Sequence, residues 1–372
     1  EFLYQIQDGA SGRVPNYGQN DGALVLPLSN CDYQDFRPVI QATQYFSTRT
    51  RCYSSGPWDE DSLWLFGPDA LAASVGRKEH TDFGAEQGGC YTLRSQDGFV
   101  FTRCGAFRHR PTQADILHVD LWWRGQNIAL DAGTFSYNAP EPWDDPLSKT
   151  AYHDTVSVDG CDQMERVRRF LWLPWATGRV QSHKRSAAGH LAYWEGEHDG
   201  YARLNIPALH RRSILRVGEH WLVLDRVTSA AEHDYRLHWL LIDAAYDCAD
   251  SNKRLTLKTP AGSYSVEVAS SATESACSIV RADEASPRGW SAPYYNYRQP
   301  ALSLALTARG RSLSFWTAFG PEPCRVTSSN DNLQLQTDQW HAKITFQMDN
   351  KRESLVTSIS LAGAVQDQLE IA

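Results

Sequence analysis

Hydrophobic and polar residues alternate along most of the chain, and the clearest example lies in residues 116–123. The odd positions of this run are all apolar. The even positions add a histidine and an acid to the apolar residues: Ile116, His118, Asp120 and Trp122. Because successive side chains of a strand point to opposite faces, the run predicts a strand with one apolar face and one mixed face that carries His118 and Asp120.

The N-terminal part of the chain has helical rather than strand-like spacing. Two apolar runs that begin with acidic residues, 32–46 and 59–66, predict helices. Beyond them the period of the pattern becomes that of strands, and Gly76 lies at the change. We therefore expect an α-helical segment over residues 1–75 and a β domain over residues 76–372.

Strand-like runs separated by turn residues continue to the C-terminus. Residues 89–103 contain two such runs around Asp97 and Gly98, a dipeptide typical of hairpin turns. Cys90 and Cys104 flank this hairpin and could form a disulfide across it. Further alternating runs lie at 254–268, 301–306, 312–316 and 342–346. These patterns predict a mainly β fold built on one large antiparallel unit.

Composition and motif searches exclude several classes of function. The 372 residues carry a net charge of −8, so we do not expect a nucleic-acid binder, which needs clustered Lys and Arg. One short basic cluster, at residues 166–169, could face an acidic substrate or form a solvated strand face. No apolar run reaches the roughly 18 residues of a membrane span. Motifs of serine hydrolases, phosphate-binding loops, dinucleotide-binding folds and zinc proteases are also missing.

Several motifs, in order, resemble the heparinase II/III-like family of polysaccharide lyases over most of the chain. They lie at residues 113–115, 125–137, 153–163, 198–201, 210–212 and 289–294. The resemblance implies a toroid of α-helices followed by a large antiparallel, layered β-sandwich, with the active site between them. Residues 13–22 are similar to a late loop of that toroid. We therefore expect the helical segment to be the end of a toroid, and a missing toroid portion or a second copy of the chain to be a partner.

The resemblance also implies β-elimination at a uronic acid, which has three chemical requirements. The sugar carboxylate must be neutralised, the C5 proton removed and the departing O4 protonated. A tyrosine suits the proton transfers when a nearby positive charge lowers its pKa, and Tyr17 with Arg13 and Asn16 supplies that set. Asn20 is a further candidate for binding the substrate. The alternative is that residues 15–18 form a plain turn with an aromatic lid.

Three more candidates lie in the β domain. Tyr152 could reach the same cleft as a second catalytic tyrosine, or it could be packed at a strand end. The family often has a catalytic histidine where Pro111 stands, and His109 is near enough to replace it or to be a surface residue only. Trp143 could stack on a sugar ring or plug the hydrophobic core.

Family members commonly hold a structural metal, usually zinc, and the resemblance assigns its ligands to Gln113, Asp131 and His153. Histidine and carboxylate suit zinc, whereas a glutamine amide is a poor ligand, so binding should be weakened or lost. The other interpretation of Asp131 and His153 is a buried ion pair that fixes the loop between them. His118 and Asp120 are interpreted as a structural histidine or a charged pair.

Two functions follow as expectations. The first is a polysaccharide lyase-like enzyme that cleaves an acidic, uronate-containing polysaccharide or oligosaccharide by β-elimination. The second is a noncatalytic glycan-binding or scaffolding protein, which the replacements at Pro111 and Gln113 favour. The substrate class favours a periplasmic or extracellular location, and a leader could have preceded Glu1.

Overall fold

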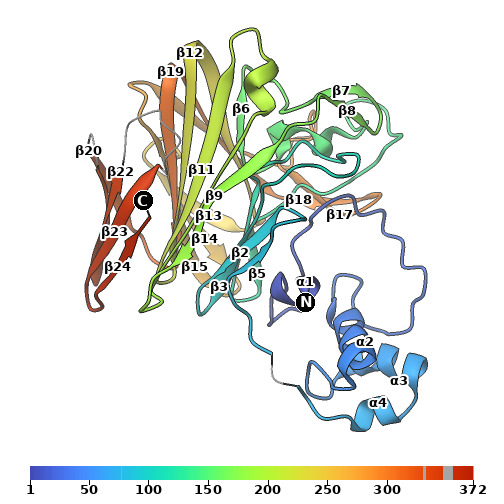
Figure 1. Cartoon of the computed structure of the whole chain (residues 1–372). Helices are drawn as coiled ribbons and strands as arrows, with labels where there is room; N and C mark the ends of the chain where they lie inside the picture. The colour runs from blue at the N-terminus through green and yellow to red at the C-terminus, as the bar shows by residue number, and fades with distance from the viewer. Residues whose placement is uncertain (77, 330–331, 347–354, 372) are drawn as a thin grey trace.

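A helical segment at the N-terminus lies beside a much larger unit of antiparallel strands (Figure 1). The computed structural model describes residues 1–76, 78–329, 332–346 and 355–371. The helical segment contains α1 (Phe2–Gln5), α2 (Arg37–Thr48), η1 (Pro57–Asp59), α3 (Glu60–Phe66) and α4 (Asp69–Ala72). Three short 3₁₀ helices lie among the strands: η2 (Pro146–Ser148), η3 (Thr150–Tyr152) and η4 (Gly200–Arg203).

The two predicted helices form, but the first begins later than its pattern indicated. α2 starts at Arg37 rather than at residue 32, because Asp35 accepts a hydrogen bond from the backbone N–H of Arg37 (3.0 Å) and Pro38 occupies the first turn. α3 starts at Glu60, one residue later than predicted, since η1 precedes it. No helix in the described ranges combines the length and the apolar character that crossing a membrane requires.

The described strands form one 15-stranded sheet, one five-stranded sheet and two two-stranded ribbons. The 15-stranded sheet has the order β1-β2-β3-β4-β5-β12-β19-β15-β14-β13, with β6, β9, β10, β11 and β16 attached beside this path. Its strands are β1 (Phe83–Ala85), β2 (Cys90–Arg94), β3 (Gly98–Arg103), β4 (Val119–Trp123), β5 (Gln126–Ala129), β6 (Val156–Val158), β9 (Gly178–Arg185), β10 (Leu191–His198), β11 (Ala208–Val217), β12 (His220–Leu241), β13 (Ala245–Ala249), β14 (Arg254–Thr259), β15 (Gly262–Ser270), β16 (Ser275–Arg281) and β19 (Leu302–Gly320). The five-stranded sheet contains β20 (Arg325–Ser329), β21 (Asn332–Gln336), β22 (Trp340–Phe346), β23 (Val356–Gly363) and β24 (Asp367–Glu370). The ribbons pair β7 (Glu165–Arg168) with β8 (Leu171–Leu173), and β17 (Trp290–Tyr294) with β18 (Tyr297–Pro300).

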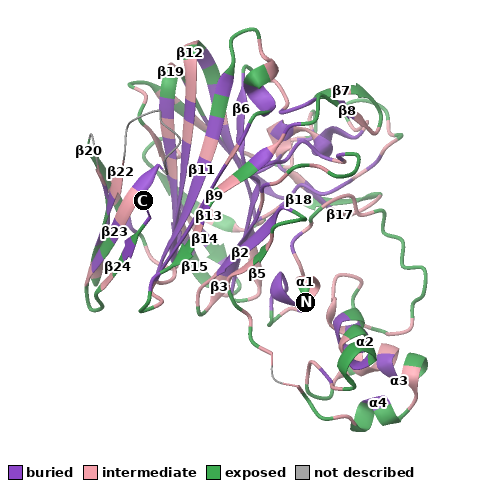
Figure 2. Ribbon diagram, in the orientation of Figure 1, coloured by how far each residue is buried: buried purple, intermediate pink, exposed green. Residues whose placement is uncertain are grey.

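The long central strands β12 and β19 separate two hydrophobic cores. Because side chains alternate along a strand, Leu222 and Leu224 of β12 pack in the core beneath the five-stranded sheet, whereas Trp221 and Val223 pack in the larger core on the other face. Figure 2 shows buried residues concentrated along these strands. Burying each such side chain stabilises the fold by roughly 1.5–3 kcal/mol. The predicted mainly β, layered antiparallel sandwich is therefore confirmed.

The predicted hairpin of residues 89–103 is also confirmed. β2 pairs with β3, with Cys90 opposite Arg103 and Arg94 opposite Phe99. The disulfide considered across this hairpin does not form, since Cys90 and Cys104 are both buried free thiols.

The strand predicted over residues 116–123 is shorter than its pattern indicated. It begins only at Val119, because Leu117 has a left-handed backbone conformation (φ 65°) that a strand excludes. Both faces of β4 are buried. His118 and Asp120 therefore lie inside the protein rather than on a mixed surface.

The helical segment docks on the β unit through α1. Ile6, just after α1, is fully buried and packs with Trp122 of β4. Arg94 of β2 donates hydrogen bonds to the backbone carbonyls of Gln5 (2.6 Å) and Gln7 (2.9 Å). These contacts place the loop that follows α1 against β4 and β5.

Candidate functional site

A cavity of about 610 Å³ opens between the loop after α1 and the edge of the β unit. Its volume lies within the roughly 300–1,000 Å³ of small-ligand sites. The loop contributes the four site residues predicted within it: Arg13, Asn16, Tyr17 and Asn20. The β unit contributes the predicted metal ligand Asp131. Carboxamides dominate the polar lining: Asn16, Gln19, Asn20, Gln34, Gln126, Asn127 and Gln299.

Asp131, just after β5, joins this cavity to the interior of the sandwich. One carboxylate oxygen, Oδ1, accepts hydrogen bonds from the Asn16 side-chain amide (2.8 Å) and from the backbone N–H of Gly133 (2.7 Å). The other oxygen, Oδ2, lies 3.0 Å from Nδ1 of His153, which follows η3. The predicted substrate-binding residue Asn16 and the predicted ligands Asp131 and His153 thus form one connected chain.

Asp131 and His153 are both buried and influence each other's charge. Burial alone would raise the pKa of Asp131, but the positive charge of His153 outweighs it and holds that pKa below its usual range. Burial alone would lower the pKa of His153, but the negative charge of Asp131 raises it. Each group thus favours the charged form of the other, which supports the ion-pair interpretation.

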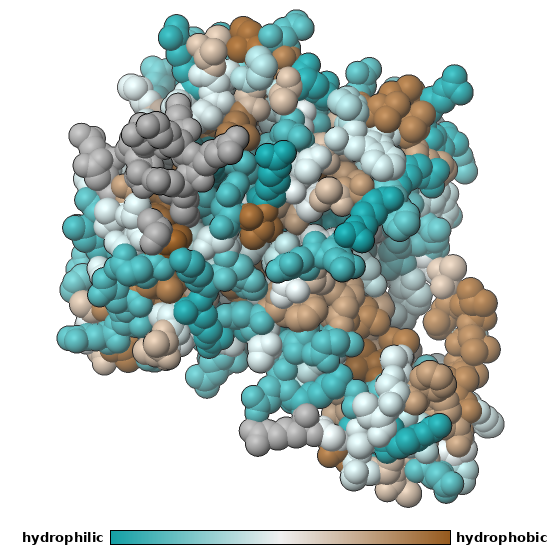
Figure 3. Space-filling view, in the orientation of Figure 1, coloured by the Kyte–Doolittle hydropathy of each residue, from teal (hydrophilic) through white to brown (hydrophobic). Residues whose placement is uncertain are grey.

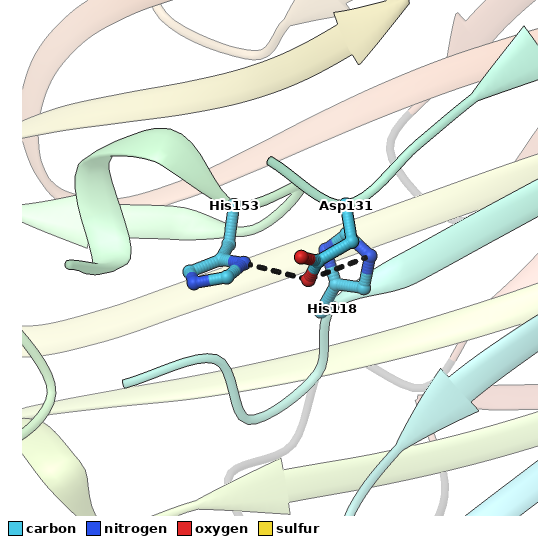
Figure 4. Close-up of side chains that lie close together, drawn as sticks. All are labelled: His118, Asp131 and His153. Atoms are coloured by element: carbon cyan, nitrogen blue, oxygen red, sulfur yellow. Dashed lines mark hydrogen bonds and ion pairs between the residues drawn. The ribbon is translucent and has the colours of Figure 1, made fainter. Parts of the chain in front are cut away.

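His118, from the turn before β4, completes a cluster with this pair (Figure 4). Its Nε2 lies 3.8 Å from Oδ2 of Asp131 and 3.8 Å from Oδ2 of Asp120. Its Nδ1 accepts a hydrogen bond from the backbone N–H of Asp154 (3.0 Å), so the ring hydrogen is on Nε2. Nε2 of His118 and Nε2 of His153 have no hydrogen-bond partner among the described residues.

The donor atoms of this cluster fit zinc in kind, because two imidazoles and a carboxylate lie within 4.8 Å of one another. Their hydrogen bonds do not fit, since a ligating nitrogen must lose its hydrogen and the Asp154 amide keeps the His118 hydrogen on Nε2. The predicted third ligand, Gln113, is buried, and neither of its amide atoms has a described partner. Zinc binding by Gln113, Asp131 and His153 stays a prediction. His118 would join such a site only if its ring released the Asp154 amide.

Tyr17 lies at the cavity with 40% of its surface exposed, and its ring packs edge-to-face on Phe2. Burial raises the pKa of its hydroxyl, and the charge of Arg13 does not offset this effect. The expectation that positive charge lowers this pKa is therefore wrong for the protein without substrate. Tyr17 keeps its hydrogen at neutral pH, as a proton donor must.

The other two loop residues differ in how far their polar groups are occupied. Asn20 donates a hydrogen bond to the backbone carbonyl of Pro293 (3.1 Å) and accepts one from the Tyr33 hydroxyl. Its carboxamide thus fixes the loop to β17. Arg13 is exposed, and its guanidinium forms no ion pair with another described residue.

The three remaining candidates for catalysis and substrate binding lie outside the lining of this cavity, as do the predicted metal ligands Gln113 and His153. Tyr152 packs with the cluster around Leu147, and burial raises the pKa of its hydroxyl. His109 is exposed in the loop between β3 and β4. Trp143 lies between two other aromatic rings, and Arg298 covers it at 4.0 Å from the ring centre. Tyr152 and Trp143 therefore do not line this cavity, and their roles stay predictions.

The sequence interpretation missed three polar groups at the cavity. The side-chain oxygens of Asn127 and Ser291 are buried without a described partner. Asp243 lines the cavity and pairs with Arg281. Asn127 and Ser291 lie within two of the motifs that resemble the family, residues 125–137 and 289–294, but those motifs gave them no role. Their position at the cavity depends on β5 and β17 lying close together, which a single sequence does not show.

Comparisons with known proteins agree with this fold. The family described as "Heparinase II/III-like, C-terminal" matches residues 77–356. The solved structure of heparan sulfate lyase HepC from Pedobacter heparinus is 16% identical, with a TM-score of 0.66, over 100% of this chain and 51% of that protein. A heparinase III structure is 14% identical, with a TM-score of 0.66, over 99% of this chain and 50% of that protein. The chain therefore spans about half the length of these structures, and at such identities the similarity shows the fold alone. A comparison with curated protein sequences finds no match.

Proposed function

The chain belongs to the heparinase II/III-like family, and from this premise we propose that it acts as a polysaccharide lyase on an acidic, uronate-containing glycan. The observation that carries the proposal is the cavity, where an unpaired guanidinium and a protonated tyrosine lie beside a buried ion pair. These groups are Arg13, Tyr17, Asp131 and His153. A uronate glycan offers a carboxylate that Arg13 can bind and a leaving oxygen that Tyr17 can protonate.

The reaction that fits these groups is β-elimination. A base takes the C5 proton, the electrons of that C–H bond form the C4=C5 double bond, and the C4–O4 bond breaks. O4 then takes a proton and leaves as a hydroxyl. Negative charge on the carboxylate grows as the C5 proton departs, so Arg13 beside it would lower the barrier. Tyr17 would donate the proton to O4.

The described lining of the cavity offers no carboxylate outside an ion pair to act as the base. The two carboxylates of the described lining, Asp131 and Asp243, are held in ion pairs with His153 and Arg281. We propose that the base belongs to the partner predicted from the sequence, a further portion of the α-helical toroid or a second copy of the chain.

The surface of the helical segment supports such a partner. Phe46, Trp64 and Leu65 are 68%, 66% and 50% exposed. Figure 3 shows hydrophobic residues gathered at the lower right, over this segment and its loop between α1 and α2. Contiguous exposed apolar surface of this kind is typical of interfaces. We propose that toroid helices cover it and close the cavity from that side.

A specific observation also favours the second candidate function, a noncatalytic glycan-binding protein. Tyr152 and His109, two of the three predicted catalytic residues, lie outside the cavity lining, whereas Arg13 and the carboxamides, which we propose bind carboxylate and hydroxyls, line it. Such a site would hold a uronate glycan without cleaving it.

Ultraviolet absorbance of the unsaturated uronate product tests the proposal on a panel of uronate glycans. We expect a signal on at least one of them. Tyr17→Phe should lower the rate at least about 100-fold because it removes the proton donor, with little change in glycan affinity. The control is Tyr297→Phe, which alters an exposed tyrosine outside the cavity lining and should leave the rate unchanged. Binding without absorbance on every glycan would instead establish the noncatalytic function.

A further inference from the structure

The cavity contains few charges that could bind an anionic sugar. Among its described lining residues the only cation is Arg13, and the acids are Asp131 and Asp243. Asp243 forms a two-point ion pair with Arg281 (2.6 and 2.7 Å), so that cation is already engaged. The cavity therefore offers one free positive charge, enough for one carboxylate.

The adjoining hollow adds no further free cation. It shares Arg13 with the cavity and contains Arg37, whose guanidinium is bound by both oxygens of Asp35 at 2.7–3.0 Å. Asp32 brings another negative charge to the same hollow. A glycan that continues from the cavity along this surface would meet acids and an occupied arginine rather than an array of free cations.

Neutral hydrogen-bonding groups are plentiful instead. Besides its carboxamides, the cavity holds two buried oxygens without a described partner, Oδ1 of Asn127 and Oγ of Ser291. Unpaired buried polar atoms are costly unless a ligand satisfies them. Sugar hydroxyl and acetamido groups supply both donors and acceptors, and the rings of Tyr17 and Tyr33 offer faces on which sugars pack.

We propose that the glycan bound here is unsulfated, with one carboxylate per bound uronate held by Arg13 and its hydroxyls held by the neutral lining. Each sulfate would add a permanent negative charge to a cavity whose described lining offers no cation besides Arg13. Placing such a charge there is unfavourable because a buried anion without a partner is costly. This inference rests on the proposed uronate function and specifies its substrate class.

Matched pairs of glycans test the inference with the full chain. Heparin is compared with desulfated, re-N-acetylated heparin, and chondroitin sulfate with chondroitin, by calorimetric binding and by ultraviolet absorbance. We expect at least one unsulfated member to bind at least about tenfold more tightly than its sulfated counterpart. Tighter binding of the sulfated members, or no preference in either pair, would overturn the inference.

The same measurements separate this inference from the proposed function. If an unsulfated glycan binds preferentially but is not cleaved, the substrate class stands and β-elimination falls. If a sulfated glycan is preferred and cleaved, β-elimination stands and the substrate class falls.

Arg13→Gln isolates the charge contact. It should weaken binding of the preferred unsulfated glycan about tenfold, because a charge-assisted hydrogen bond is lost. Binding of the carboxyl methyl ester of that glycan should not change, since the ester has no charge for Arg13 to bind. The matched control is Arg309→Gln, at an exposed arginine outside the lining. Equal losses with the free acid and with its ester would also contradict the proposal.

Discussion

Two buried networks of histidine and acid lie within the β unit, and they differ in how completely their hydrogen bonds are satisfied. In the first, Nε2 of His198 lies 3.2 Å from Nδ1 of His210, and Nε2 of His210 lies 2.6 Å from Asp225. Nδ1 of His198 accepts the backbone N–H of Gly200, and Arg212 binds both oxygens of Asp225. Every ring nitrogen in this closed network has a partner.

The second network is open. Nε2 of His118 and Nε2 of His153 have no described hydrogen-bond partner, and Asp131 reaches the cavity through Asn16. The motifs that resemble the family include members of both networks, Asp131 and His153 of the open one and His198, His210 and Arg212 of the closed one, so the resemblance does not distinguish them. The unpaired buried nitrogens and the contact with a cavity do, because the fold gains nothing from leaving them unsatisfied.

The closed network supports the open one. Arg212 donates hydrogen bonds to the backbone carbonyls of Leu117 and Asp154. Leu117 directly precedes His118, and Asp154 supplies the amide that fixes the His118 ring. The closed network therefore positions the open one. We infer that the closed network stabilises the fold and that the open network belongs to the functional site.

The largest expected effect comes from breaking the closed network. Arg212→Met should lower the free energy of unfolding by about 3–5 kcal/mol, because it leaves the charge of Asp225 buried without its main partner. Urea unfolding measures this loss. The control is Arg254→Met, which removes exposed ion pairs and should cost less than about 1 kcal/mol. Equal losses in the two variants would show that the closed network is not the stabilising element.

A smaller effect is expected in the open network. Asp131→Asn should cost about 1–3 kcal/mol at neutral pH, less than Arg212→Met, because His153 can lose its proton once its partner is neutral. Urea unfolding at a series of pH values measures the difference between wild type and variant. The control is Asp159→Asn, which removes a histidine-paired but partly exposed acid and should cost less than about 1 kcal/mol.

The pKa shifts of the pair fix how that difference depends on pH. The pKa of Asp131 is lowered in the folded state, so its contribution is present above the ordinary aspartate pKa and is lost as pH falls through the lowered value. The pKa of His153 is raised, so its contribution is complete below the ordinary histidine pKa and is lost as pH rises through the raised value. The difference should be largest between these limits and shrink on both sides. A difference that is constant across the whole range would contradict the ion pair.

The sequence predicted the cavity loop well and the residues facing it poorly, for a physical reason. Arg13, Asn16 and Tyr17 lie within five residues of one another, so one local motif specified them together. Trp143 is covered by Arg298, and Tyr152 packs in the cluster around Leu147, through contacts set by tertiary packing. Such contacts leave no spacing to detect in a single sequence.

The position of His118 also depends on tertiary packing that the sequence pattern does not show. Its alternation with Asp120 predicted a strand position, whereas the left-handed turn at Leu117 directs the ring to Asp131 and His153. The sequence did mark both polar residues as shared by one face. The sequence could not indicate that this face would be buried near His153, which lies 22 residues after Asp131 in the chain.

The smallest expected effect concerns metal in the open network. Removing metal from the purified chain with a chelator should shift its melting temperature by less than about 1 °C, and adding zinc should not raise it. A structural zinc would contribute several kcal/mol and thus several degrees. The reason is the hydrogen on Nε2 of His118, which the Asp154 amide keeps in place, together with the amide of Gln113 where a better ligand is expected. One zinc per chain by elemental analysis, with a large loss of stability on chelation, would mean that the His118 ring has released that amide. The open network would then be a metal centre, with His118, Asp131 and His153 as ligands.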